Sequence, residues 1–176
     1  MLNFDELLKA FGQLTITFGA FDEEVTAMAE SLDRQGRDIA RKRLARWTLG
    51  AKITHLEKEI EQIASSYGMA DDPLTLKLRA LIPEFRWITE QRNLLVHGSI
   101  RSEPIAQLNF ISFGGTHLEL TPELVWEVIN RIRNVFPDVI TVGIAFYKEW
   151  KRCAKAQQKP IRKAESARMK PAGAKR

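Results

Sequence analysis

The sequence contains one cysteine, Cys153, in 176 residues, and it has no long apolar run. One thiol cannot form an internal disulfide or a cysteine-rich zinc site, which favours a reducing compartment. No apolar stretch approaches the 18 or so residues that a membrane span requires. The N-terminus lacks the basic segment and following apolar run of a secretory signal peptide. We therefore expect a soluble, cytoplasmic protein without membrane association.

Histidine is also scarce, with three residues in the chain. The histidines and carboxylates do not cluster at the spacing of a metal-ligand set. The pair Gly114-Gly115 is not followed by the residues of a phosphate loop, and the chain has no dinucleotide fingerprint or nucleophile elbow. The sequence thus predicts no metal ion and no cofactor.

The composition, 44% hydrophobic and 28% charged, is that of one globular domain with a core of its own. The net charge of +5 is unevenly distributed: residues 148–176 carry eleven Lys or Arg and two Glu, which leaves −4 for the rest. We expect a folded domain over residues 1–157 and a basic, disordered tail over residues 158–176. The tail either binds RNA phosphates or is only a solubilising terminus; its candidate RNA-binding residues are Lys159, Arg162, Lys163, Arg168 and Lys170.

Apolar residues recur every three or four positions over residues 4–32, 49–67 and 73–97, and again from residue 122 onward, which predicts four helices. Gly68 and Gly98 are placed to end the second and third helices, and Asp72-Pro73 to begin the third. Pro83 should kink or divide its helix, and Pro137 should bend the last one. The basic stretch 34–46 is either a loop or a solvated helical turn.

The apolar period changes over residues 105–120, where β-formers flank Gly114-Gly115. Two glycines accept the positive φ angles of a tight hairpin turn. The predicted fold class is therefore all-α, an up-and-down bundle of four or five helices with a small β-hairpin between the third and fourth.

Arg92 is unusual because it occupies an apolar position on the third helix. Either it forms an internal ion pair, for example with Glu84 or Glu90, or its side chain reaches water, or it serves a functional site. His97 follows five positions later, a rotation of about 140° and a rise of about 7.5 Å in an ideal helix. The two side chains therefore need not touch within one chain, although two copies could meet across a dimer axis.

The segment from Gln91 to Gly98 resembles the signature of the HEPN superfamily (higher eukaryotes and prokaryotes nucleotide-binding). In that signature an arginine and a polar residue precede a histidine by four to six intervening positions; Arg92, Asn93 and His97 match it. The resemblance also covers the order of the helices, with the motif toward the end of the third. It implies a metal-independent endoribonuclease of toxin or defence type, a site formed where two protomers pair, and a possible cognate antitoxin protein.

The matched residues suit that chemistry. A histidine can take the proton of a ribose 2′-OH or protonate the leaving 5′-oxygen. A guanidinium can hold the phosphate and stabilise its added negative charge, and Asn93 can orient either group. The alternative is a non-catalytic interaction module that binds a protein partner or RNA. We expect His55 and His117 to face solvent, and Trp87 either to pack in the core or to stack on a base.

Overall fold

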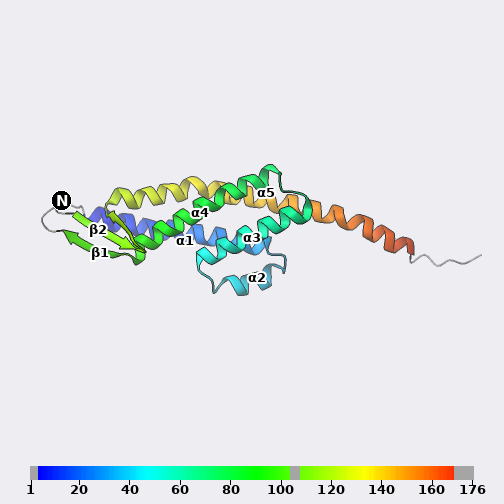
Figure 1. The fold of residues 1–176 in the computed structure, drawn as a ribbon, viewed down its shortest axis with the longest axis horizontal. Helices are drawn as coiled ribbons and strands as arrows, with labels where there is room; N and C mark the ends of the chain where they lie inside the picture. Colours follow the sequence, from blue (N-terminus) through cyan, green and yellow to red (C-terminus); the bar gives the residue numbers. More distant parts are fainter. Residues whose placement is uncertain (1–3, 104–107, 169–176) are drawn as a thin grey trace, which may run out of the picture.

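The periodic apolar segments form the helices that the sequence predicts, in a computed structural model that describes residues 4–103 and 108–168. The protein is mostly helical, with a small sheet between its fourth and fifth helices (Figure 1). The helices are α1 (Phe4–Leu32), α2 (Arg37–Leu44), α3 (Leu49–Tyr67), α4 (Pro73–His97) and α5 (Pro122–Arg168). The strands are β1 (Ser99–Glu103), β2 (Leu108–Phe113) and β3 (Thr116–Glu119).

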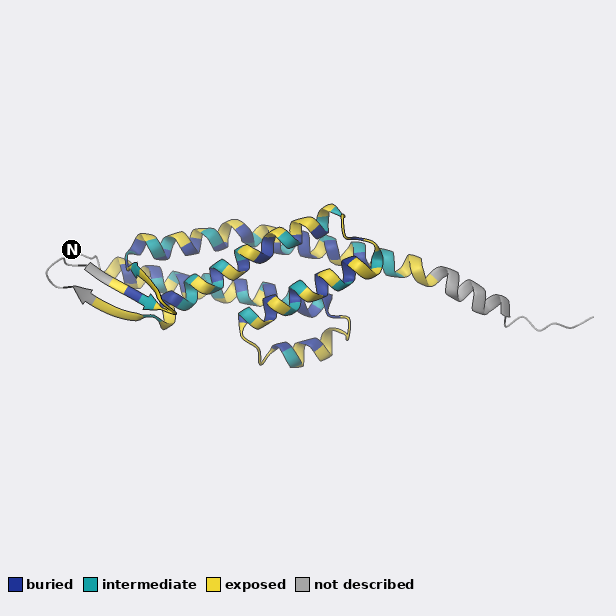
Figure 2. Ribbon diagram, in the orientation of Figure 1, coloured by how far each residue is buried: buried dark blue, intermediate teal, exposed yellow. Residues whose placement is uncertain are grey.

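Helices α1, α3, α4 and α5 surround one apolar core, and the short α2 lies on the outside (Figure 1). Helices α1, α3 and α5 run in one direction and α4 runs in the other, so the C-terminus of α4 lies near the N-terminus of α3. The buried faces of the long helices point inward (Figure 2). Phe21 of α1 and Phe85 of α4 meet edge to face in the core, with ring centroids 5.4 Å apart.

The helix boundaries follow the predicted capping residues. Gly68 ends α3 with a φ of 68°, a left-handed conformation that favours glycine. The carboxylate of Asp72 accepts a hydrogen bond from the Leu74 N–H at 2.9 Å, and Pro73 opens α4. Pro83 and Pro137 lie inside α4 and α5, so neither proline divides its helix.

The sheet has three antiparallel strands in the order β1-β2-β3, one strand more than the predicted hairpin. The β2–β3 hairpin turns at Gly114 and Gly115, whose φ angles are 59° and 85°, as predicted. β1 was missed because its sequence, Ser-Ile-Arg-Ser-Glu, has one large apolar residue and no strand-like apolar pattern. Ile111 is the buried anchor of β2 and pairs in register with Ile100 and Leu118.

Helix α5 continues past the bundle to Arg168, which corrects the prediction of disorder for residues 158–168 (Figure 1). The segment is rich in Ala, Lys, Arg and Gln, which favour helix, and it extends a helix that the core has already nucleated. Residues 169–176 lie outside the described residues. None of the described helices is both long enough and apolar enough to cross a lipid bilayer.

Candidate functional site

The three residues of the motif lie together at the C-terminal end of α4. Arg92 Nη1 is 3.0 Å from His97 Nε2 and donates a hydrogen bond to Asn93 Oδ1 at 3.2 Å. The arginine and histidine, which helix geometry alone does not require to touch, are thus in contact within one chain. The helix does not unwind to allow this contact; α4 is regular through His97. The long arginine side chain spans the helical rise instead.

Arg92 has no carboxylate partner among the residues that the structure describes. Its guanidinium is half-buried and lies over the ring of Phe18 on α1, 5.0 Å from the ring centroid. Glu84, a candidate partner, instead binds Arg131 of α5 with a shortest N–O distance of 2.7 Å. This hydrogen bond to Arg131 holds the pKa of Glu84 below its usual range. The internal ion pair, one of the alternatives for Arg92, is not found among the described residues, which leaves its positive charge available to an anion.

The Arg92–His97 contact restricts the protonation state of the imidazole. An arginine N–H can only donate, so a hydrogen bond from Nη1 requires His97 Nε2 to be unprotonated and to accept. A phosphate that binds the guanidinium would compete for that N–H and release Nε2. In this arrangement His97 can act as a base when an anion occupies Arg92.

The motif opens onto a cleft of about 440 Å³. Four elements and the residue that precedes α3 form its walls: Phe18 and Asp22 of α1, Thr48 ahead of α3, Leu49 and Gly50 of α3, Thr89, Arg92, Asn93 and His97 of α4, and Phe113 of β2. These residues are far apart in the sequence, and the sequence alone identified only the three motif residues Arg92, Asn93 and His97.

The N-terminus of α3 forms one wall of this cleft. Thr48 caps the helix by accepting a hydrogen bond from the Ala51 N–H at 3.3 Å. The first N–H groups of a helix have no acceptor within it, and they carry the positive end of the helix dipole. The cleft therefore combines a helix N-terminus with the Arg92 guanidinium, an arrangement suited to phosphate.

Asp22 is the one carboxylate among the described residues that line the cleft. Its Oδ1 lies 2.9 Å from Lys52 Nζ of α3 and accepts a hydrogen bond from the Thr26 hydroxyl at 3.2 Å. Because Lys52 neutralises it, Asp22 does not cancel the positive charge of Arg92.

His55 does not face solvent, which corrects a second prediction. Its side chain is 10% exposed, and Nε2 lies 2.9 Å from the carboxylate of Asp33, whose side chain is 1% exposed. The guanidinium of Arg43 binds the same carboxylate and stacks on Trp47, 5.4 Å from the ring centroid. The cluster of Asp33, Arg43, Trp47 and His55 joins the end of α1 to α2 and α3, outside the cleft.

The remaining candidates do not join the cleft. Trp87 is covered by the Arg131 guanidinium, 4.1 Å from the ring centroid, and does not line the cleft. His117 is exposed on β3, as predicted. The backbone of Lys159, Arg162, Lys163 and Arg168 belongs to the far end of α5, opposite the sheet (Figure 1), and Lys170 lies outside the described residues.

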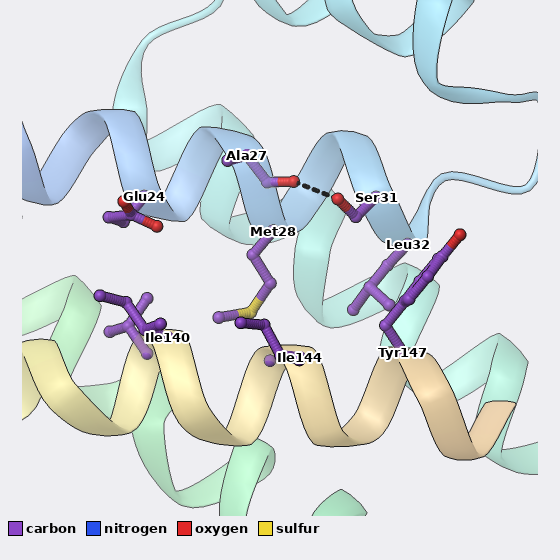
Figure 3. A pocket seen from close by; sticks show the side chains of 10 residues that line it. Glu24, Ala27, Met28, Ser31, Leu32, Ile140, Ile144 and Tyr147 are labelled. Atoms are coloured by element: carbon purple, nitrogen blue, oxygen red, sulfur yellow. Dashed lines mark hydrogen bonds between the residues drawn. The ribbon is translucent and has the colours of Figure 1, made fainter. Parts of the chain in front are cut away.

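A second hollow, of about 150 Å³, lies between α1 and α5. Figure 3 shows Met28 pointing from α1 toward Ile144 and Ile140 of α5. Of the described residues that line it, Glu24 alone is charged, so this lining offers no set of groups for catalysis. No group of three or more His, Cys, Asp or Glu among the described residues could hold a metal ion.

Comparisons with protein-family models, curated proteins and solved structures give no match.

Proposed function

We propose that this cleft binds single-stranded RNA and cleaves it as a metal-independent endoribonuclease. The observation that carries the proposal is the contact between Arg92, which has no carboxylate partner among the described residues, and His97, in an open cleft beside the N-terminus of α3. A phosphate-binding cation next to an acid–base group is the minimum that phosphodiester transfer needs.

In the proposed reaction the ribose 2′-oxygen attacks the adjacent phosphorus, and the bond from phosphorus to the 5′-oxygen breaks. The products are a 2′,3′-cyclic phosphate and a 5′-hydroxyl. His97 accepts the 2′-OH proton or donates a proton to the 5′-oxygen, Arg92 stabilises the negative charge on the phosphoryl oxygens, and Asn93 holds the guanidinium in place.

The reaction needs both a base and an acid, and the described lining of one cleft contains a single histidine. A homodimer with its two-fold axis near α4 would bring two copies of His97 to one groove, as the HEPN resemblance implies. His97 lines the cleft and is exposed, as a residue that meets its own copy across such an axis must be in the single chain. A role in a toxin or defence system, with a cognate antitoxin protein, rests on the same resemblance and stays a prediction.

The proposal is tested by incubating the purified protein with mixed single-stranded RNA in EDTA. Wild type should leave 2′,3′-cyclic phosphate ends, and His97→Ala should lower the rate by about 10² to 10⁴, the usual contribution of an acid–base group. Arg92→Ala should lower it by a similar factor, because the transition-state charge loses its donor.

Two surface variants serve as matched controls. His117→Ala removes an exposed histidine outside the cleft, and Arg133→Ala removes an arginine that lies over Trp126, 5.9 Å from its ring centroid. Both should cleave like wild type. Equal cleavage by wild type and His97→Ala would identify a contaminating nuclease and favour the non-catalytic interaction module instead.

The dimer has a separate test. Light scattering at tens of micromolar protein should give twice the chain mass. A monomer that cleaves RNA would contradict the dimer and leave the cleavage proposal in place.

A further inference from the structure

Phe113 places an exposed aromatic ring beside the candidate catalytic histidine. Phe113 is 45% exposed and lines the cleft, and its ring centroid lies 6.4 Å from the ring centroid of His97. The planes of the two rings are inclined by 44°. An aromatic ring exposed at the edge of a cleft that also contains a guanidinium offers a face on which a flat ligand group can stack.

The sheet fixes the position of this ring. Phe113 is the last residue of β2 and pairs with Thr116 across the Gly114-Gly115 turn. Ile111, two residues earlier and therefore on the same face of the strand, is fully buried. Buried Ile111 thus anchors the strand while Phe113, beyond the edge of the core, extends toward the cleft.

The other aromatic ring of the cleft has a different environment. The Arg92 guanidinium covers a face of Phe18, so that ring positions the cation. Among the described residues, no cation lies over the ring of Phe113. The one described ring that lies close to it is that of His97. The ring of Phe113 is therefore available for stacking.

We infer that Phe113 is the base-stacking residue of the cleft: it stacks on the nucleobase next to the phosphate that Arg92 and His97 contact. The inference rests on the proposed RNA substrate and adds how the strand is held. Proteins bind unpaired nucleotides by stacking bases on aromatic side chains, and every base has a face that can stack. The subsite should accept all four bases and discriminate against a strand without bases.

The test uses fluorescently labelled 2′-O-methyl tetranucleotides, which lack the attacking hydroxyl and cannot be cleaved by this route. One probe carries four bases and the other four abasic sites. Wild type should bind the first more tightly, and Phe113→Ala should weaken that binding by about 5-fold to 150-fold, the value of one stacked base. The same variant should bind the abasic probe like wild type, and Phe113→Tyr should keep most of the affinity for bases.

Phe110→Ala is the matched control, because Phe110 lies on the same strand, is 37% exposed and is absent from the lining of the cleft. It should bind both probes like wild type. Circular dichroism of each variant checks that the helices are intact.

The outcomes separate the two proposals. If wild type cleaves RNA but Phe113→Ala binds the base-containing probe as tightly as wild type, the stacking inference is overturned and the nuclease proposal stands. If no RNA is cleaved but Phe113→Ala selectively loses the base-containing probe, the stacking inference stands and the nuclease proposal fails. Equal binding of both probes by wild type would also overturn the inference.

Discussion

At the scale of single residues, Asp33 shows how one buried carboxylate organises its surroundings. Its carboxylate binds the Arg43 guanidinium and His55 Nε2, and accepts a hydrogen bond from the Gln35 N–H at 2.8 Å. A buried carboxylate is tolerated when its lone pairs are occupied in this way. These three contacts come from the α1–α2 turn, α2 and α3, so Asp33 holds α2 against the bundle.

Asp33→Ala should destabilise the protein by about 3 kcal/mol, because it leaves Arg43 and the largely buried His55 without their shared acceptor. The measurement is the free energy of unfolding from urea titration. Asp38→Ala, which removes an exposed carboxylate from the first turn of α2, should change that free energy by no more than about 0.5 kcal/mol. A loss below about 1 kcal/mol for Asp33→Ala would show that Asp33 is not what holds α2 against the bundle.

The motif residues and the buried cluster differ in how far the sequence predicts them. Arg92, Asn93 and His97 are close in sequence on one helix, so their spacing is visible in the chain. His55 looked exposed because it lies on the polar side of α3, and its partners Asp33 and Arg43 lie on the α1–α2 turn and on α2. A polar residue that a neighbouring segment covers cannot be distinguished by periodicity from one that faces water.

At the scale of elements, the junction of α4 and β1 depends on Gly98. Its φ of −69° and ψ of 148° are open to any residue, so glycine is not required there for its backbone conformation. Space is the reason instead: a Cβ at Gly98 would overlap the Leu94 carbonyl oxygen and lie 2.5 Å from Ile111 Cγ1. The predicted helix stop is confirmed, but the cause is the close approach of β2 to the end of α4.

Gly98→Ala should therefore destabilise the protein by about 1–3 kcal/mol, the usual cost of overpacking a core. Because β2 carries Phe113, the substitution should also weaken binding of the base-containing probe. Gly12→Ala is the matched control: nothing lies within 4 Å of its added Cβ, and alanine favours helix over glycine by about 0.5–1 kcal/mol. Thermal unfolding should show the two variants shifting in opposite directions, and a stable Gly98→Ala would contradict this account of the junction.

The elements that the sequence predicts well are those with a strong local pattern. Four amphipathic helices, their capping residues and the diglycine turn follow from periodicity and conformational preference. β1 follows from neither, because it is stabilised by pairing with β2 along the register from Ser99 with Ser112 to Glu103 with Leu108. Phe113 reaches the cleft through the pairing of β2 with β1 and β3 and the burial of Ile111, which is why this wall of the site was not visible in the sequence.

At the scale of the whole molecule, the basic end of the chain is separate from the cleft. Helix α5 packs on the core as far as Trp150 and the partly buried Cys153, and Gln157 reaches the Ser66 carbonyl oxygen at 3.4 Å. Beyond that point α5 extends away from the bundle to Arg168 (Figure 1). Residues 158–176 carry seven Lys or Arg and one Glu. Among the described residues, the side-chain contacts of α5 with the rest of the bundle thus extend to Gln157, just ahead of this basic segment.

Deleting residues 158–176 should weaken RNA binding and flatten its dependence on salt, because the seven cations supply phosphate contacts that do not depend on sequence. Each phosphate neutralised on a single strand contributes about 0.7 to the slope of log affinity against log salt concentration, so the slope should fall by up to about 5 if all seven engage. Replacing the seven by glutamine in the full chain should give the same change, which distinguishes charge from chain length. Cleavage at saturating RNA should remain, because this segment has no histidine and because the C-terminal end of α4, which carries Arg92 and His97, lies far from the end of α5 (Figure 1). A salt slope that stays unchanged in both variants would make the segment a solubilising terminus and move the search for phosphate contacts to the basic residues 34–46 around α2.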